Sequence, residues 1–234
     1  MNGLSVNGLS VNSLSVNSLS VNSIRVAIAS ALSLISISAA QAQTPSIEPT
    51  NLDTLRLGSK IEGPVGPEVE TSFINTAGNG VGDLSSSVYC PTTISEGCIP
   101  AETPLGTIYT YVYEVTPGVD LPNDAPFPQP DGLDPFERIE SFQLNFPAVG
   151  FNGVAGYSFS EAKQATEAKT LIIESNLDGS LVWRLPAEAD WKAGETISFF
   201  WQTTEPPIGP NGSYGLAGDG RLSGAVGPLP AAAR

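Results

Sequence analysis

The segment Gly194–Pro210, GETISFFWQTTEPPIGP, constrains the fold more than any other part of the chain. Its residues Ile197, Phe199 and Trp201 stand at every second position, which is the pattern of a β-strand with one buried face. Phe200 interrupts the polar side, so the pattern predicts a central strand that is covered on both faces. The pair of prolines that follows removes two backbone donors and predicts the end of the strand.

The chain contains no histidine, and this excludes several classes of site. Ser-His-Asp and Cys-His catalytic sets need an imidazole, as do most zinc and non-haem iron sites. The predicted loop Ala77–Asp83 contains Gly78, Gly80 and Gly82, but their spacing fits neither the dinucleotide fingerprint nor the P-loop. We therefore expect no cofactor, no metal and no catalytic residue.

Residues 1–25 repeat a five-residue unit: MNGLS, VNGLS, VNSLS, VNSLS, VNSIR. This period fits neither a helix nor a strand, so we interpret the repeat as a low-complexity extension. Arg25 then precedes a short apolar run that ends in Ala-Gln-Ala at residues 40–42, the pattern of a secretory signal peptide. A membrane span would need about 20 unbroken apolar residues.

We expect cleavage near Ala42 and a secreted or periplasmic mature chain, residues 43–234, without a transmembrane anchor. A translation start near Val21 is an alternative explanation of the long extension. The chain has 10 basic and 24 acidic residues, a formal net charge of −14, and only Arg25 of these lies before the predicted cleavage site. Such an acidic chain repels nucleic acid and anionic lipid, so we expect neither as a partner, and we expect a monomer.

Short strand patterns recur along residues 43–234 and are separated by turn signals. The clearest is Thr107–Thr116, in which three tyrosines share one face, and this predicts a half-buried tyrosine face. Trp183 is in phase with its apolar neighbours and is predicted to lie in the core. The other predicted strands are Val69–Asn75, Phe136–Phe146, Thr170–Ser175, Leu181–Leu185 and Arg221–Val226, with a short first strand around Leu52, Leu55 and Leu57.

Local signals complete the predicted architecture. Asn152-Gly153 and Asp178-Gly179 are typical of hairpin turns, and Ile139 is out of phase with its strand, which predicts a bulge. Ser160–Lys169 is predicted to be a surface helix capped by Ser160, and Pro117–Pro135 is predicted to be a long loop. These features together predict an antiparallel β-sandwich of jelly-roll or Greek-key type, with one short surface helix, long Pro/Gly loops and a loose glycine-rich C-terminal tail.

Cys90 and Cys98 bracket the loop CPTTISEGC. In an exported protein two such cysteines are expected to form a disulfide, worth roughly 2–3 kcal/mol in the chain-entropy model. A redox or metal pair would need CxxC spacing or further ligands. Asp124, Asp131 and Asp134 in the proline-rich loop raise the question of calcium binding, but the EF-hand pattern is absent and solvated loop acids are the simpler interpretation.

Several segments resemble secreted β-sandwich proteins of cyanobacteria and other Gram-negative bacteria that are associated with PEP-CTERM sorting. The resembling segments are YTYVYEV (Tyr109–Val115), SFQLNF (Ser141–Phe146), Gly194–Pro210 and the closing GAVGP (Gly224–Pro228). The resemblance implies an extracytoplasmic location and a β-sandwich, without a reaction. The chain departs from that group at its end, since LPAAAR has no Pro-Glu-Pro motif, and this removes the basis for anchoring by the sorting system.

Three functions are compatible with these patterns. The first is a non-catalytic secreted or cell-surface protein with a structural or interaction role, whose partner is a surface or matrix component. The second is a carbohydrate-binding module, in which Trp191, Tyr157 and Tyr214 would stack on sugar rings. The third is a carboxylate-dependent glycoside hydrolase, which needs two carboxyls roughly 5–10 Å apart in a cleft. The carboxylates considered for it are Glu114, Glu140, Glu161 and Glu174.

Overall fold

The computed structural model describes residues 45–62, 68–94, 97–167 and 170–231. Residues 42–234 form one compact unit, and the following account concerns the described part of that unit. The predicted pentad repeat and signal peptide lie outside the described residues. In the part of the chain that is described, no helix is long and apolar enough to span a membrane.

The all-β class predicted from the sequence is confirmed. Strands dominate the described residues, together with one α-helix, α1 (Phe159–Thr166), and the 3-10 helices η1 (Leu52–Thr54) and η2 (Pro100–Glu102). The strands are β1 (Ser46–Ile47), β2 (Thr50–Asn51), β3 (Val69–Ile74), β4 (Gly80–Tyr89), β5 (Tyr109–Pro117), β6 (Ile139–Leu144), β7 (Phe151–Tyr157), β8 (Ile172–Ser175), β9 (Leu181–Arg184), β10 (Ile197–Thr203), β11 (Pro207–Gly218) and β12 (Arg221–Pro230).

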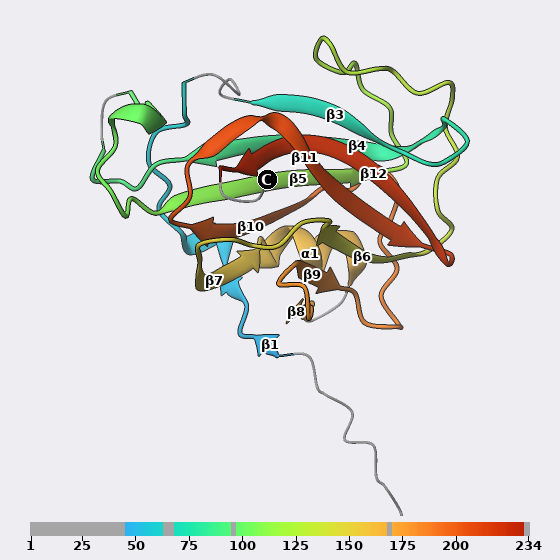
Figure 1. The fold of residues 1–234 in the computed structure, drawn as a ribbon. Coiled ribbons are helices and arrows are strands. Elements are labelled where there is room, and N and C mark those ends of the chain that lie inside the picture. Colours follow the sequence, from blue (N-terminus) through green and yellow to red (C-terminus); the bar gives the residue numbers. More distant parts are fainter. Residues whose placement is uncertain (1–44, 63–67, 95–96, 168–169, 232–234) are drawn as a thin grey trace, which may run out of the picture. The chain divides into compact units, whose positions relative to one another are not determined.

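These strands form one continuous sheet in the order β1-β8-β9-β6-β11-β12-β3-β4-β5-β10-β7-β2. Only the pair β2–β7 among the described strands is parallel. The sheet curls (Figure 1), so that β6 packs against β10 although several strands separate them in the order: the rings of Phe142 and Phe199 stack with centroids 4.8 Å apart. The expected sandwich of two sheets is therefore not confirmed, because one curled sheet encloses the core.

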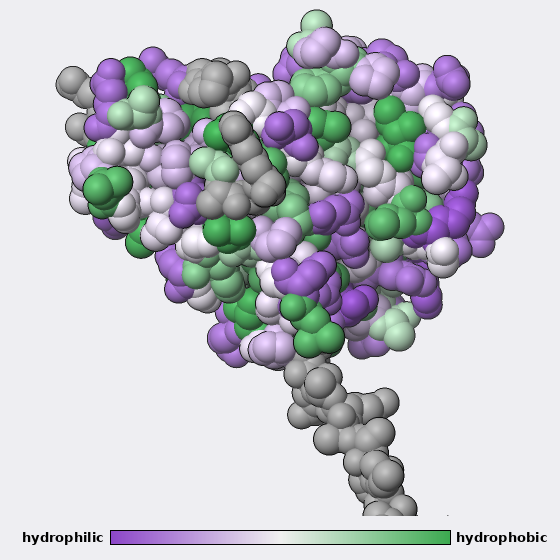
Figure 2. Space-filling model, viewed as in Figure 1, coloured by the Kyte–Doolittle hydropathy of each residue, from purple (hydrophilic) through white to green (hydrophobic). Residues whose placement is uncertain are grey.

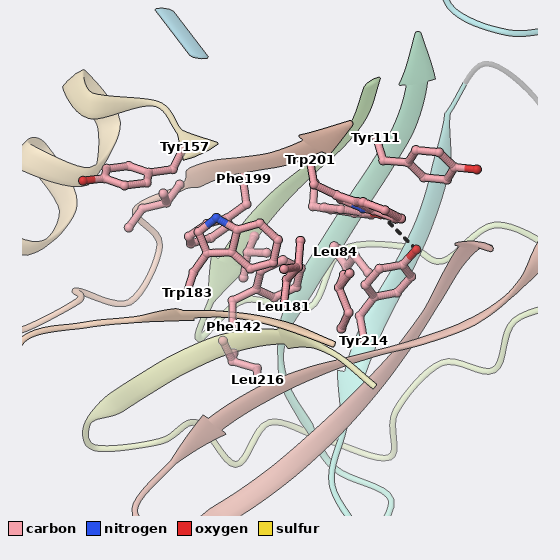
Figure 3. Packing of buried hydrophobic residues seen from close by; sticks show 14 of the residues in the cluster. Leu84, Tyr111, Phe142, Tyr157, Leu181, Trp183, Phe199, Trp201, Tyr214 and Leu216 are labelled. Atoms are coloured by element: carbon pink, nitrogen blue, oxygen red, sulfur yellow. Dashed lines mark hydrogen bonds between the residues drawn. The ribbon is translucent and has the colours of Figure 1, made fainter. Parts of the chain in front are cut away.

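Aromatic rings fill the concave face of the sheet (Figure 3). Phe142 lies at their centre, with ring centroids 5.5 Å from Trp183 and 5.6 Å from Tyr113. Trp183 is fully buried, as its pattern predicts. Rings at these separations and tilts gain favourable edge and offset contacts beyond the burial of their area. The aromatic core therefore joins β5, β6, β9 and β10, which are distant from one another in the chain.

Strand β10 is central, as its sequence predicts. It pairs with β5 on one side and with β7 on the other. Ile197, Phe199 and Trp201 have no exposed surface, and neither does Phe200 on the opposite face. The predicted strand at Thr107–Thr116 is confirmed as β5, but its tyrosine face is fully buried because the curled sheet covers it.

The N-terminal segment joins the two edges of the sheet. Strand β1 pairs with β8 at one edge and β2 pairs with β7 at the other, and only two residues separate β1 from β2. Asp53 in η1 accepts hydrogen bonds from the Ser158 hydroxyl and the Ser160 backbone N–H, so this segment also holds the start of α1. The predicted first strand around Leu52, Leu55 and Leu57 is wrong, because Asn51 caps a 3-10 turn there.

Strands made of small residues lack the alternation of large apolar residues by which strands were predicted. Strand β4 includes part of the predicted loop Ala77–Asp83, and β11 and β12 form a long hairpin where a loose tail was expected. Small side chains allow neighbouring backbones to approach: a Cβ on Gly82 would lie 2.7 Å from the Pro117 Cα, and one on Gly218 would lie 2.3 Å from the Arg138 carbonyl oxygen. The predicted loop is therefore wrong from Gly80 onwards, and the predicted loose tail is wrong as far as Pro230. The predicted strand Arg221–Val226 is confirmed as part of β12.

Turn and cap predictions succeed only in part. The Asp178-Gly179 turn joins β8 to β9, and the β6–β11 register shifts next to Ile139, so the turn and the bulge are confirmed. Asn152-Gly153 is not a turn, because it lies inside β7. The helix is present, but its cap is Ser158, whose hydroxyl accepts the Glu161 N–H at 3.2 Å, and not Ser160.

Candidate functional site

The three aromatic residues predicted to stack on sugars lie inside the protein. Trp191, Tyr157 and Tyr214 are 4%, 2% and 0% exposed. The Trp191 ring N–H donates to the Glu195 carbonyl at 2.7 Å, and the Tyr157 hydroxyl accepts the Leu171 N–H at 2.9 Å. A ring can stack on a sugar only if one of its faces is free, so the prediction for these residues is wrong: all three rings belong to the buried core.

Tyr214 instead belongs to a buried chain of hydrogen bonds. The Trp201 ring N–H donates to the Tyr113 hydroxyl at 2.9 Å, which lies 3.0 Å from the Tyr214 hydroxyl, and Tyr214 donates to the Pro228 carbonyl. Burial raises the pKa of both phenols well above the ordinary value for tyrosine. Both hydroxyls therefore keep their protons, and each donor in the chain has one acceptor.

Two of the four glutamates considered for glycoside hydrolysis are used in surface ion pairs. Glu140 lies 3.2 Å from the Arg138 guanidinium, and Glu174 lies 2.6 Å from that of Arg184. Both partners of each ion pair are partly exposed, and exposed ion pairs contribute little to stability. These two glutamates lie on β6 and β8, whereas the other two lie on β5 and α1.

Glu161 and Glu114 lie on either side of Ser198 in β10. Glu161, from α1, accepts the Ser198 backbone N–H at 2.7 Å, and Glu114, from β5, stands opposite Ser198 in the strand register. Desolvation, followed by the charges of Glu68 and Glu161, raises the pKa of Glu114. Because Glu161 is occupied by a backbone donor, this arrangement fixes α1 against β10, and we assign no catalytic pair.

The three aspartates considered for calcium lie at different points of the β5–β6 loop, residues 118–138. Asp124 accepts the Glu70 backbone N–H at 3.0 Å, and Asp134 forms an ion pair with Arg221 at 2.8 Å. The Asp131 backbone N–H bonds to the turn before β4. Within the described ranges, no group of three or more cysteine or acidic side chains is arranged to hold a metal ion.

Cys90 and Cys98 form the predicted disulfide, and both are buried. Their loop is bound to a neighbouring segment: the Gly58 N–H donates to the Cys90 carbonyl at 3.1 Å, and the Glu62 N–H donates to the Cys98 carbonyl at 3.0 Å. The approach at Gly58 is so close that a Cβ there would lie 2.4 Å from the Cys90 carbonyl oxygen. Both cysteines at the ends of the disulfide loop are therefore bonded to the segment 58–62.

An apolar hollow of about 340 Å³ lies beside the disulfide loop. Leu105 on its wall is fully exposed, at 106%, and Ile108 is 39% exposed. Both turns that form the wall are closed by backbone hydrogen bonds, from Ile94 to Pro91 and from Thr107 to Pro104. The residues that line the apolar hollow are Pro91, Thr93, Ile94, Pro104, Leu105, Gly106, Thr107 and Ile108.

A second hollow, of about 320 Å³, is polar and is lined by Thr166, Glu167, Glu188, Asp190 and Lys192. Lys192 bonds Glu167 at 2.9 Å, and this contact lowers the pKa of the glutamate and raises that of the lysine. Both side chains are exposed, so the pair behaves as an ordinary surface ion pair. Figure 2 shows a surface on which hydrophobic and hydrophilic residues alternate, without one dominant patch on the visible face.

The sequence did not predict the apolar hollow. Its lining comes from two separate turns, residues 91–94 and 104–108, which precede and follow the second cysteine of the disulfide in the chain. The apolar residues Leu105 and Ile108 after the second cysteine were the signal in the sequence that could have indicated it. Comparison of the chain with protein-family models, with curated proteins and with solved structures finds no match.

Proposed function

We propose that this is a non-catalytic exported protein with a structural or interaction role, and that the apolar hollow contacts an apolar segment of a cell-surface or matrix partner. The observation that carries the proposal is the exposure of Leu105 and Ile108 on a concave, disulfide-bordered surface. Apolar side chains gathered in an exposed hollow are typical of an interaction site.

The rigidity of the apolar hollow supports the proposal. One wall follows a disulfide and the other is a turn closed by the Thr107 N–H and hydroxyl, which both donate to the Pro104 carbonyl, at 3.1 and 2.7 Å. Gly106, with φ of +80°, supplies the left-handed residue that this turn requires. A preformed surface loses little conformational entropy on binding, so even a modest apolar contact contributes to affinity.

A sedimentation assay tests the proposal. The full chain is labelled and incubated with cell-envelope fragments of the source organism, and the bound fraction is compared between wild type and Leu105→Glu. We expect binding to weaken at least about tenfold, because a charge in the apolar hollow would lose its hydration on contact. Leu177→Glu is the matched control, since Leu177 is 92% exposed in the β8–β9 turn, away from the hollow.

Both variants are expected to melt at the wild-type temperature, because both side chains are exposed. Equal retention of the two variants would contradict the proposed contact site. Competition by soluble polysaccharide that is insensitive to Leu105→Glu would instead favour a carbohydrate-binding role at another surface.

A further inference from the structure

We propose that Asp83 is a proton-dependent latch, which together with Ser72, Asp120 and Asn123 holds the start of the β5–β6 loop to strands β3 and β4. Asp83 and Ser72 stand opposite each other in the β3–β4 register and are 4% and 3% exposed. Asp120 and Asn123 come from the loop above them. The Leu121 backbone N–H donates to Asp83 Oδ2 at 2.7 Å, so Asp83 contacts the loop directly.

The hydrogen count in this cluster is unbalanced. The Ser72 hydroxyl lies 2.9 Å from Asn123 Oδ1, 3.2 Å from Asp83 Oδ1 and 3.5 Å from Asp120 Oδ1, yet it carries only one hydrogen. The Asn123 side-chain amide donates to the Pro128 carbonyl, which fixes its oxygen towards Ser72. If Ser72 donates to this nearest oxygen, a proton on Asp83 allows the carboxyl to donate to Ser72 in turn. One added proton therefore gives the Ser72–Asp83 contact a hydrogen of its own, and the third oxygen belongs to Asp120, which is exposed to solvent.

Like charges face each other across the same boundary. Asp120 lies on the loop side of Asp83, and Thr116 of β5, which stands opposite Asp83 in the register, brings no charge. Further along, Asp124 of the loop bonds the backbone of Glu70 in β3. Two more charged groups lie beyond Glu70. The charge of Glu68 raises the pKa of Glu70, and Glu68 itself forms an ion pair with Lys60. At neutral pH the carboxylates of the loop therefore face the carboxylates of the sheet.

The direction of the pH effect follows from these contacts. Desolvation by burial, with the charge of Asp120 adding to it, raises the pKa of Asp83 to about 6, although the bonds from Leu121 and Ser72 oppose this change. An Asp83 that is released into water returns to the ordinary value of 3.8. The closed latch thus binds the proton more tightly than the open one, so falling pH favours the closed loop and rising pH through 6 favours opening.

Loosening the latch would also alter a neighbouring recess. Ser72 and Asn123 form part of the wall of a recess of about 70 Å³, which Phe127 of the loop and Val226 of β12 also line. The polar residues in its wall are these two latch residues and Thr71, and the rest of the wall is apolar or glycine. The latch therefore couples the protonation of one buried carboxyl to the shape of the surface over β3 and β12.

Hydrogen exchange of the Leu121 amide tests the proposal, because this N–H is bonded to Asp83 itself. Exchange is measured on the full chain in EDTA at pH 5.0, 6.0 and 7.5 and is corrected for the intrinsic rate at each pH. With a pKa of about 6 in the closed state and 3.8 in the open state, the opening constant should be roughly tenfold larger at pH 7.5 than at pH 5.0. An opening constant that is unchanged, or larger at pH 5.0, would overturn the proposal.

Asp83→Asn should remove the pH dependence, because its amide donates to Ser72 at every pH and its oxygen still accepts from Leu121. Asp131→Asn, in the same loop but outside the cluster, should retain the tenfold change. If Asp83→Asn does not fold, Asp120→Asn, a change at an exposed residue, tests the proposal instead. Loss of the charge that faces Asp83 should move the midpoint of the pH dependence of the opening constant to lower pH. A midpoint that stays in place would show that Asp120 does not act on the latch and would overturn that part of it.

Discussion

The concave and outer faces of the curled sheet both bury polar groups, but the hydrogen bonds of these groups are balanced differently on the two faces. On the concave face, the chain from Trp201 through Tyr113 to Tyr214 gives each donor one acceptor. On the outer face, the single hydroxyl hydrogen of Ser72 faces three oxygens, and one of them belongs to the buried Asp83. The first network is complete with neutral groups, whereas in the second the Ser72–Asp83 contact gains a hydrogen of its own when Asp83 binds a proton.

This difference indicates that one network contributes to the stability of the fold and the other to its dependence on pH. A fully satisfied network in a low-dielectric core specifies one arrangement and resists change. A network with too few hydrogens is sensitive to its surroundings, since burial disfavours the charge that it carries at neutral pH. We therefore expect the concave face to determine how stable the fold is, and the outer face to determine how stability varies with pH.

Phe142→Ala should have the largest effect and would test the role of the concave face. Its removal leaves a cavity that rigid strands cannot fill, because Phe142 lies against five aromatic rings, those of Phe73, Tyr113, Trp183, Phe199 and Tyr214. We expect a loss of about 3–5 kcal/mol in the free energy of unfolding, measured by urea denaturation. The exposed Leu177→Ala should change it by less than about 0.5 kcal/mol.

Gly156→Ala examines the N-terminal segment that closes the sheet. A Cβ on Gly156 would lie 1.8 Å from the Thr50 carbonyl oxygen and 2.7 Å from the Phe200 ring, so β2 must move. Overpacking of this kind costs about 1–3 kcal/mol in the free energy of unfolding. Gly209→Ala is the control, because a Cβ there meets no atom within 4 Å. Equal losses in the two variants would mean that the contact with Thr50 is unimportant.

The sequence predicted the segments in which large apolar residues alternate. Among the strands made of small residues it predicted only Arg221–Val226 of β12 and missed β4 and β11. The period-2 pattern of β10 and β5 follows directly from burial of one or both faces, so these strands could be read from the chain. In β4 and in the β11–β12 hairpin, glycine and serine carry little hydropathy signal. Their burial comes from the neighbouring strands, which no local pattern reveals.

The candidate sites were less predictable than the fold, because they depend on contacts between distant segments. Only the disulfide of Cys90 and Cys98 could be predicted, since its two members share one loop. Trp191 stands in a turn that suggested exposure, yet the turn packs it on the core. The latch joins Ser72, Asp83 and Asp120 from two strands and a loop, and sequence spacing cannot place their oxygens together.

Tyr113→Phe would sharpen the comparison by removing one member of the balanced network. The change deprives the Trp201 ring N–H of its acceptor and the Tyr214 hydroxyl of a partner in a fully buried site. We expect a loss of about 1–3 kcal/mol in the free energy of unfolding. Because burial raises the pKa of Tyr113 far above neutrality, the loss should be the same at pH 5 and at pH 8. A loss that varies with pH would contradict a neutral network.

Asp83→Asn should give the smallest effect, and the effect should depend on pH. The folded pKa of Asp83 is raised to about 6 from 3.8, so its stabilising contribution is fully present below the unfolded value and is lost as pH rises through the folded one. Between pH 5.0 and 7.5 the wild type should therefore lose about 1.4 kcal/mol that the variant does not lose. Urea denaturation at pH 5.0, 6.0 and 7.5 measures the difference.

Glu70 and Glu114 also have a raised pKa, mainly because of desolvation, so they weaken the fold in the same direction as pH rises. Both are present in wild type and in Asp83→Asn, and subtraction of the two pH curves isolates the share of Asp83. Tyr113→Phe should keep the whole wild-type slope, since its network does not titrate in this range. Two results would contradict this assignment of roles to the two faces. One is that Tyr113→Phe reduces the change of the free energy of unfolding with pH, and the other is that Asp83→Asn leaves this change intact.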